Sequence, residues 1–195
     1  IFQEVDLEIS VKTRIGIAVP EEFPELMEIF NRYPIRELIV HPRLRTDFYK
    51  NTPDRESFGY AVKESRAPLC YNGDIFTEEA FRSAASRFPS VERVMLGRGL
   101  LANPALAERI RGIEEAPLTA SRLAAFHRAL YEGYRLAIPE ERNVLFKMKE
   151  MWTYLICMFP EADRYGKKIK KAKSAGEYEA AVAALFRERE PDPQA

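Results

Sequence analysis

The first part of the chain alternates apolar, β-rich segments with helical patterns, and this alternation constrains the fold more than any other feature. Alternation of this kind predicts βαβ units and therefore a parallel sheet. The strands are almost continuously apolar, which is typical of strands covered on both faces. The expected strands span 7–15, 36–43, 67–73 and 91–99, and the expected helices span 21–33, 55–65, 77–88 and 103–112.

The second part of the chain has helical patterns only. Apolar residues recur at helical spacing from Ser121 onward, and segments 143–159 and 175–190 repeat the pattern. We therefore expect an α/β domain over residues 1–113, followed by an all-α helical bundle domain over residues 118–190.

The composition excludes several classes of protein. The 195 residues include 30 basic and 30 acidic side chains, so the net charge gives no sign of a polyanionic partner. Cys70 and Cys157 form neither a metal-binding spacing nor a disulfide framework, so we expect two core cysteines, no metal and a reducing, cytoplasmic setting. No apolar run reaches the ~20 residues that span a membrane. The chain lacks a starting methionine and opens inside an apparent element, which predicts a fragment; removal of the methionine or other processing is the alternative explanation.

Each predicted strand ends in a polar or glycine-containing cluster. The carboxyl ends of parallel strands meet at one edge of the sheet, where α/β folds bind their ligands. Four consecutive strands with this feature predict a ligand site. The clusters are Lys12-Thr13-Arg14, His41-Pro42-Arg43, Asn72-Gly73-Asp74 and Gly97-Arg98-Gly99.

Two of these clusters predict a phosphate site. Glycines at Gly97 and Gly99 let a backbone approach an anion closely, and the Arg98 guanidinium adds positive charge. The Asn72-Gly73 turn follows the preceding strand, and barrels frequently build phosphate sites from the loops after their last two strands. Plain strand-to-helix turns are the alternative explanation.

Lys12 and His41 are the other candidate ligand contacts. Lys12 lies inside a strand, where a charge is costly unless it is paired or faces a polar cavity. It therefore either pairs with an acidic neighbour or points at a cofactor or an oxyanion. His41 follows an apolar run directly, and either contacts a ligand or is a structural histidine at the rim. His127 falls in the apolar stripe of a helix, and we interpret it as structural.

Residues 164–173 form the strongest charge cluster, with one arginine, five lysines and no acidic residue. Lys147, Lys149 and Trp152 on the preceding helix add basic and aromatic character. A surface of this kind suits the phosphate backbone of RNA. A solvated helix face or loop is the alternative.

The segments VKTRIG, LIVHPRLRTDFY, YNGDI and VMLGRGLLANPAL together resemble the tRNA-dihydrouridine synthase family. The resemblance covers essentially the whole chain. It implies the C-terminal half of an FMN-binding (β/α)8 TIM barrel followed by a helical tRNA-binding domain. It also implies a flavoprotein oxidoreductase in which FMN takes hydride from NADPH and reduces the C5–C6 bond of particular uridines in tRNA.

The resemblance assigns a role to each candidate residue. Lys12 and His41 would contact the flavin. The phosphate end would be held by Asn72, Gly73, Asp74, Gly97 and Arg98, and the tRNA would contact Arg43, Arg45, Lys147, Lys149, Lys167, Lys168, Lys170 and Lys171.

One departure from the family is informative. The family's general acid is a cysteine in an Asn-Gly-Cys-Pro motif, which this sequence lacks. We therefore expect no catalytic residue in this chain, a cysteine upstream of it, and no activity from the chain alone. Four strands of an open barrel would leave two edges and an apolar inner face, which predicts self-association. We expect some of five strand residues to lie on that face, namely some of Leu38, Val40, Leu69, Val94 and Leu96.

Two other functions stay open at this point. A phosphate-binding FMN barrel could act on free pyrimidines, or the helical domain alone could be a non-enzymatic RNA-binding module. The lysine-rich segment 164–173 favours the tRNA enzyme over the first alternative, because an enzyme of free pyrimidines has no need of it.

Overall fold

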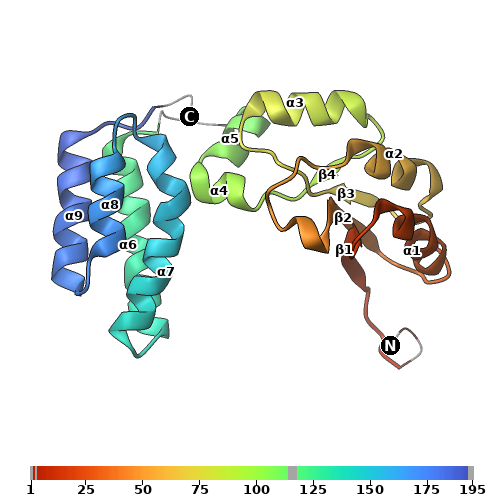
Figure 1. The fold of residues 1–195 in the computed structure, drawn as a ribbon, viewed down its shortest axis with the longest axis horizontal. Helices are drawn as coiled ribbons and strands as arrows, with labels where there is room; N and C mark the ends of the chain where they lie inside the picture. Colours follow the sequence, from red (N-terminus) through yellow and green to blue (C-terminus); the bar gives the residue numbers. More distant parts are fainter. Residues whose placement is uncertain (1, 3, 114–117, 193–195) are drawn as a thin grey trace. The chain divides into compact units, whose positions relative to one another are not determined.

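The computed structural model describes residue 2, residues 4–113 and residues 118–192. Its chain forms two compact units that meet in the sequence between Gly97 and Arg98. One unit holds the sheet with its first three α-helices, and the other holds helices α4 to α9 (Figure 1).

The sheet unit is a four-stranded parallel sheet in the order β1-β2-β3-β4. This confirms the predicted strands and the predicted parallel sheet, although β3 and β4 are shorter than expected. The elements are β1 (Ser10–Gly16), η1 (Pro20–Glu22), α1 (Phe23–Phe30), β2 (Glu37–Leu44), η2 (Arg45–Asp47), α2 (Arg55–Glu64), β3 (Leu69–Tyr71), α3 (Glu78–Arg87) and β4 (Arg93–Val94).

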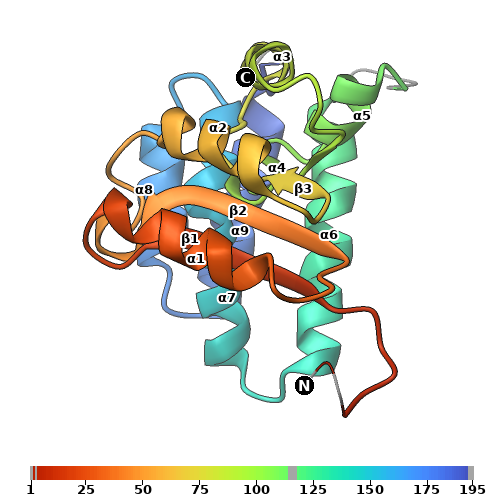
Figure 2. The same cartoon turned by 90° about the vertical axis from the view of Figure 1, so that its right-hand side faces the viewer.

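The register divides the strand residues between two faces of the sheet. Val40 is opposite Thr13 on one side and Tyr71 on the other, and the ring of Tyr71 packs edge-on against Phe58 of α2 at 4.7 Å. This face is therefore the one that the helices cover, and Figure 2 shows α1 and α2 lying across β1 and β2. Leu38 and Val40 are fully buried there, so these two are not among the residues that could face a missing half of the barrel.

The second unit is helical throughout its described residues. Ala105, Leu118 and Leu123 share one hydrophobic core with the long helices that follow. Its elements are α4 (Arg98–Ala102), α5 (Leu106–Arg111), α6 (Ala120–Ala137), α7 (Glu141–Leu155), η3 (Ile156–Met158), α8 (Asp163–Lys171) and α9 (Ala175–Glu188).

The helical unit differs from the expectation in two ways. It begins at Arg98, because α4 packs against α7 and η3 and α5 packs against α4, whereas the sequence suggested a boundary after residue 113. The helix expected over 103–112 is present as α5 but begins only at Leu106, after Pro104, and the additional helix α4 begins inside the expected strand 91–99. The expected linker at 114–117 lies outside the described residues.

Helix α8 was not among the expected helices, because its lysines hide a sparse apolar stripe. Tyr165, Ile169 and Ala172 are buried at helical spacing, and they attach the lysine-rich segment to the core. In the part of the chain that the structure describes, no helix is long and apolar enough to cross a membrane.

Candidate functional site

The face of the sheet opposite α1 and α2 carries the predicted ligand contacts. Lys12 is opposite Ile39, which is opposite Cys70, and Arg14 is opposite His41. Facing residues on adjacent parallel strands project to the same side, and so do alternate residues along one strand. The face therefore gathers cationic and imidazole side chains from β1 and β2.

Lys12 is a cation without a counter-ion among the described residues. Its ammonium is exposed and forms no ion pair or hydrogen bond with any of them. Partial burial and the nearby Arg14 charge lower the pKa of Lys12 below its usual value, although Cys70 acts in the opposite direction. The alternative explanation, an ion pair with an acidic neighbour, is therefore wrong for the described residues.

His41 is buried and neutral near pH 7. Burial, followed by the charges of Arg14, Lys12 and Arg43, lowers the pKa of His41 to about 4, and Asp74 opposes this only weakly. Its Nε2 atom lies 3.2 Å from Nη1 of Arg43, and its ring centre lies 6.2 Å from that of Tyr49.

Arg43 does not reach a surface where RNA could contact it. Its side chain is 1% exposed, and its guanidinium forms two parallel hydrogen bonds of 2.8 and 2.6 Å with the Asp74 carboxylate. Nε donates a third, at 2.6 Å, to the carbonyl of Asn51. The expectation that Arg43 contacts RNA was therefore wrong, because the guanidinium is engaged inside the fold. Arg45, in contrast, is exposed at the start of η2.

The same ion pair changes the interpretation of Asp74. The sequence suggested that Asp74 holds a phosphate, but a carboxylate repels an anion and this one binds the Arg43 guanidinium. Asp74 is thus better explained as the residue that holds Arg43 in place.

Arg14 is the site residue that the sequence reasoning did not select. Its guanidinium donates to the carbonyls of Leu44 and Phe48 at 2.5 and 3.3 Å, and it lies over the ring of Tyr49. The signal in the sequence was its spacing of two residues from Lys12, since alternate residues of a strand share a face.

Asn72 and Gly73 have structural partners at the end of β3. The Asn72 side-chain amide donates to the carbonyl of Met95 at 2.8 Å, which fastens the end of β3 to the segment after β4. A Cβ atom at Gly73 would lie only 2.1 Å from the hydroxyl of Tyr71. The packing of Tyr71 therefore requires a glycine here, whether or not an anion binds.

Gly97 and Arg98 fall on different sides of the division between the units. A Cβ atom at Gly97 would meet nothing within 4 Å, so the space beside this backbone is open. Arg98 is the first residue of α4 in the helical unit.

The two cysteines occupy different environments. Cys70 is buried in β3, and burial raises the pKa of its thiol to about 11, which confirms its interpretation as a core residue. Cys157, in contrast, is exposed in η3, so its assignment to the core was wrong. The helix α7 ends at Leu155, and the tighter turn that follows rotates Cys157 off the buried face.

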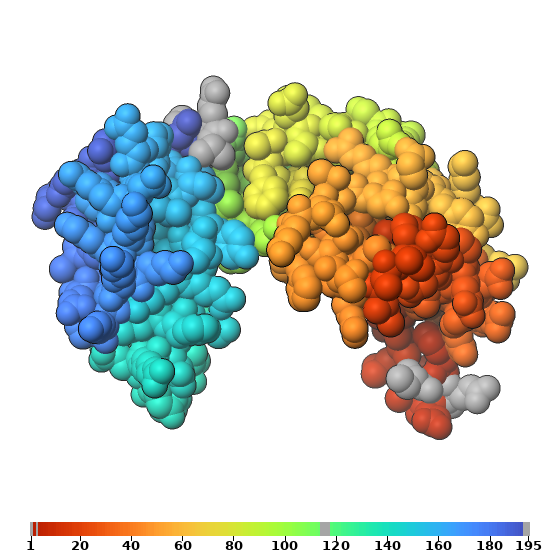
Figure 3. All heavy atoms as spheres, viewed as in Figure 1, coloured from red at the N-terminus to blue at the C-terminus, as the bar shows by residue number. Residues whose placement is uncertain are grey.

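Four of the lysines that the sequence suggested for RNA binding lie on α8. Lys167, Lys168, Lys170 and Lys171 are exposed, and none has a hydrogen bond or ion pair with the described residues. Figure 3 shows the bright blue segment that contains α8 on the surface of this unit. Such uncompensated charges are available to a polyanion.

Lys147 and Lys149 contribute less than the sequence suggested. The ammonium of Lys147 pairs with Glu150 at 3.5 Å, and that of Lys149 donates to the carbonyl of Ala172 just after α8. Because this carbonyl lies at the negative end of the helix dipole, Lys149 stabilises α8.

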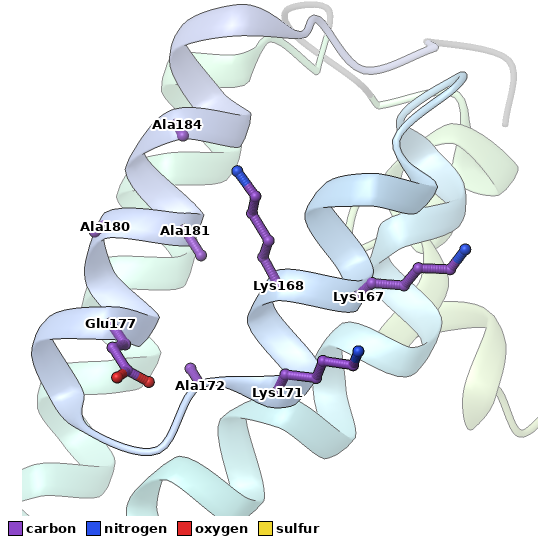
Figure 4. Close-up of a pocket in the computed structure, with 8 residues that line it drawn as sticks. All are labelled: Lys167, Lys168, Lys171, Ala172, Glu177, Ala180, Ala181 and Ala184. Carbon is purple, nitrogen blue, oxygen red and sulfur yellow. The ribbon is translucent and has the colours of Figure 1, made fainter.

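Two grooves flank α8. The first, of about 540 Å³, lies between α8 and α9, and Figure 4 shows Lys168 extending between these helices while Lys167 and Lys171 point away from α9. The α9 wall is formed by Ala180, Ala181 and Ala184, whose small side chains leave the groove open. The second groove lies between α7 and α8 and is lined by Trp152, Lys167 and Lys170 among others.

Within the described ranges, no group of three or more His, Cys, Asp or Glu side chains is arranged to hold a metal ion. Cationic and neutral nitrogen donors dominate the sheet face, and lysines dominate α8.

Comparisons with known proteins show what this chain resembles. The family model described as dihydrouridine synthase (Dus) matches residues 1–189, which includes both units. A tRNA-dihydrouridine(16) synthase of Pseudomonas syringae pv. tomato is 26% identical over 163 residues, which cover 80% of this chain and 50% of that protein. Proteins with the same description from Cupriavidus necator and Ralstonia nicotianae are 23% and 27% identical, covering 91% and 72% of this chain and 55% and 43% of theirs. The chain thus spans about half the length of the curated relatives it matches.

Proposed function

The chain belongs to the dihydrouridine synthase family, and on that premise we propose that it supplies the C-terminal part of a tRNA-dihydrouridine synthase. The sheet unit would be the second half of an FMN-binding (β/α)8 barrel, and the helical unit would bind tRNA. The chain spans about half the length of these relatives, which supports the proposal that it corresponds to one part of such an enzyme. We propose the reaction, reduction of the C5–C6 bond of uridine with NADPH as reductant, for the protein that contains both halves of the barrel.

The proposal rests mainly on Lys12, whose ammonium forms no ion pair with any described residue. Partial burial and the nearby Arg14 charge make the ammonium of this otherwise exposed lysine less favourable than that of a free lysine. An anionic or electron-rich ligand would remove that penalty. Bound FMN supplies the hydride-transfer chemistry, and its reduced form is such a ligand.

The residues of the sheet face fit a flavin. Lys12 would lie beside the electron-rich part of the ring and stabilise negative charge there, and neutral His41 would donate a hydrogen bond to the cofactor. Asn72 and Gly73 would shape the phosphate end by fastening β3, and the open space beside Gly97 would admit the phosphate. Arg98 would add its charge, as proposed from the sequence, whereas Asp74 would act only through Arg43.

The tRNA would contact the lysines of α8. Lys167, Lys168, Lys170 and Lys171 carry charges that no described residue offsets, and Arg45 offers a further exposed cation in the sheet unit. Lys147 and Lys149 would play minor parts, because Glu150 and the Ala172 carbonyl engage their charges. The family match over both units favours this function over an enzyme of free pyrimidines and over an RNA-binding module alone.

The general acid of the reaction would come from outside this chain. Cys70 is buried and its pKa is raised to about 11, so it is a poor source of the proton that uracil C5 requires. With FMN, NADPH and unmodified tRNA supplied, we expect no dihydrouridine from the 195-residue chain alone. Dihydrouridine formed by this chain would overturn that part of the proposal.

Titration of the chain with FMN, followed by flavin fluorescence, tests the cofactor site. Lys12→Ala is expected to weaken FMN binding, or to abolish binding that is already weak. Lys63→Ala is the matched control, because Lys63 is an exposed lysine of α2 in the same unit. Equal FMN affinity in the two variants would contradict the role of Lys12.

Binding of a transcribed tRNA across a salt series tests the helical unit. Replacing the four α8 lysines Lys167, Lys168, Lys170 and Lys171 with alanine should flatten the slope of log affinity against log salt, by about 0.7–0.9 for each phosphate that the variant no longer neutralises. Lys147→Ala is the control, since Glu150 already offsets that charge. An unchanged slope in the fourfold variant would mean that the lysines are a solvated surface.

The sheet edges give the proposal a further consequence. β1 and β4 are the edge strands, and β1 presents seven residues along which another strand could pair. We propose that the chain associates through these edges when the rest of the barrel is absent. Light scattering tests this, and a monomer at all concentrations would contradict it.

A further inference from the structure

The Arg43–Asp74 ion pair constrains the position of a proton on a neighbouring side chain. Nη1 of Arg43 lies 2.8 Å from Asp74 Oδ1 and 3.2 Å from His41 Nε2, so each of its two N–H bonds has an acceptor. A guanidinium has five N–H donors and no acceptor. His41 Nε2 must therefore accept this hydrogen bond with its lone pair, and it carries no proton.

We propose that Arg43, held by Asp74, is a positioning residue that fixes His41 as the neutral Nδ1–H tautomer. In neutral imidazole one nitrogen donates and the other accepts, so a proton excluded from Nε2 lies on Nδ1. Nδ1 then offers one N–H, and no residue in the described part of the chain accepts it. The use of that donor rests on the proposed function: it would bond a carbonyl oxygen or ring nitrogen of the bound flavin or uracil.

The guanidinium cannot easily turn away from His41. Its two bonds to Asp74 and the bond from Nε to the Asn51 carbonyl hold it on three sides, and the side chain is 1% exposed. The carbonyl of Asn51 is itself placed by a turn in which the Asn51 amide donates to Asp47. A planar, bidentate pair of this kind fixes direction as well as distance.

Most of the charges around His41 also disfavour protonation of its ring. Lys12 and Arg14 from β1 and Arg43 from β2 all oppose a positive imidazolium, while Asp74 from the loop after β3 favours it weakly. The ring of Tyr49 packs nearby without a charge that would change this balance. His41 is thus held neutral by its surroundings and held in one tautomer by Arg43.

Long-range proton–nitrogen NMR of the labelled 195-residue chain at pH 7 tests the proposal directly, because the two imidazole tautomers give different nitrogen shifts and couplings. His41 and His127 are the only histidines, so two ring systems have to be assigned. For His41 we expect a single species protonated at Nδ1. A proton on Nε2 in the parent chain would overturn the proposal.

Two variants test the cause. Arg43→Met removes the donor and is expected to give a mixture of tautomers, and to raise the pKa of His41 by removing a positive charge. The double variant Arg43→Met/Asp74→Asn removes the donor without leaving Asp74 as an uncompensated charge, so it remains informative if the single variant does not fold. Arg43→Lys keeps a donor that cannot accept, and is expected to retain the Nδ1–H tautomer.

Arg93→Met is the matched control. Arg93 also forms an ion pair within the sheet unit, with Glu37 at 2.8 Å, but it does not contact His41. It should leave the tautomer unchanged. A folded double variant that keeps a single Nδ1–H species would overturn the role of Arg43. No flavin or RNA is present in this experiment, so its failure and a failure to bind FMN are separate results.

Discussion

Each unit of this protein contains one buried histidine with its pKa lowered to about 4, but the two have different surroundings. In the sheet unit, the cations Lys12, Arg14 and Arg43 add to the effect of burial on His41. In the helical unit, burial alone acts on His127, which lies among aromatic rings at centre-to-centre distances of 5.6 to 6.1 Å. The same pKa therefore comes from a polar site in one case and from a hydrophobic core in the other.

The hydrogen-bond partners of the two imidazoles differ in the same way. His41 meets an arginine, which can only donate, so its tautomer is decided. His127 meets the hydroxyl of Tyr178 at 2.6 Å, and a hydroxyl can donate or accept. Trp152 also donates to this hydroxyl, at 2.9 Å. The comparison teaches that a lowered histidine pKa does not by itself identify a functional site, whereas the charge and donor character of the neighbours does.

The largest expected effect is the loss of the aromatic core around His127. Trp152 is 3% exposed, and Trp152→Ala should lower the free energy of unfolding of the helical unit by about 3–5 kcal/mol. Urea unfolding followed by circular dichroism measures this. Phe146→Ala, on the exposed side of the same helix, is the control and should cost less than about 0.5 kcal/mol. Similar losses in both variants would mean that the core does not centre on Trp152.

Tyr178→Phe should have the next largest effect. The change keeps the ring, which is 0% exposed, but removes the hydroxyl that His127 and Trp152 share. Leaving buried polar groups without a partner costs about 1–3 kcal/mol, again measured by urea unfolding. Tyr134→Phe on α6 serves as the control, because that ring is only half-buried. If Tyr178→Phe were neutral, the hydroxyl would not contribute to the stability of this core.

Acidification should destabilise the protein through both histidines. Each has a pKa of about 4 in the folded protein against about 6.5 when unfolded, so between these values the unfolded chain binds more protons. The free energy of unfolding should therefore fall as pH falls from 6.5 toward 4. From pH 7 to pH 5 the loss should be about 2 kcal/mol for His127, from linkage.

His127→Phe removes the contribution of His127 to the pH dependence of the free energy of unfolding. The variant should be less stable at pH 7 but should lose less stability between pH 7 and pH 5 than the parent does. Urea unfolding at the two pH values measures the difference. An identical pH dependence in the parent and the variant would show that His127 is not held neutral.

The smallest effect that we expect is a difference between the two histidines in how their pKa values respond to salt. Ions screen the charges of Lys12, Arg14 and Arg43, so the pKa of His41 should rise by a few tenths of a unit between low and high ionic strength. The pKa of His127, which burial alone lowers, should not move. NMR titration of both rings in one sample measures this, and equal shifts would remove the distinction between them.

Much of the sheet unit follows from local patterns in the sequence. The apolar runs and their turns predict four strands in order, and Asp54 and Thr77 cap the helices that follow by accepting backbone hydrogen bonds. Strands that follow one another in the sequence also pair side by side in this sheet. Their formation depends on local propensity and short connections, which can be read directly from the sequence. The burial of Cys70 and His127 follows from the same patterns.

The sequence by itself thus determined the order of the elements, the parallel sheet and the residue types at the strand ends. Only the tertiary structure decided how those residues are used. Arg43 and Asp74 are 31 residues apart, so nothing local indicates that they pair; the pairing depends on the register of β2 with β3. The same reason explains why Lys12 proved to be unpaired among the described residues and Lys149 engaged with Ala172, 23 residues away. Charges are placed by long-range packing, and a sequence pattern of period two or 3.6 carries no information about which distant group they meet.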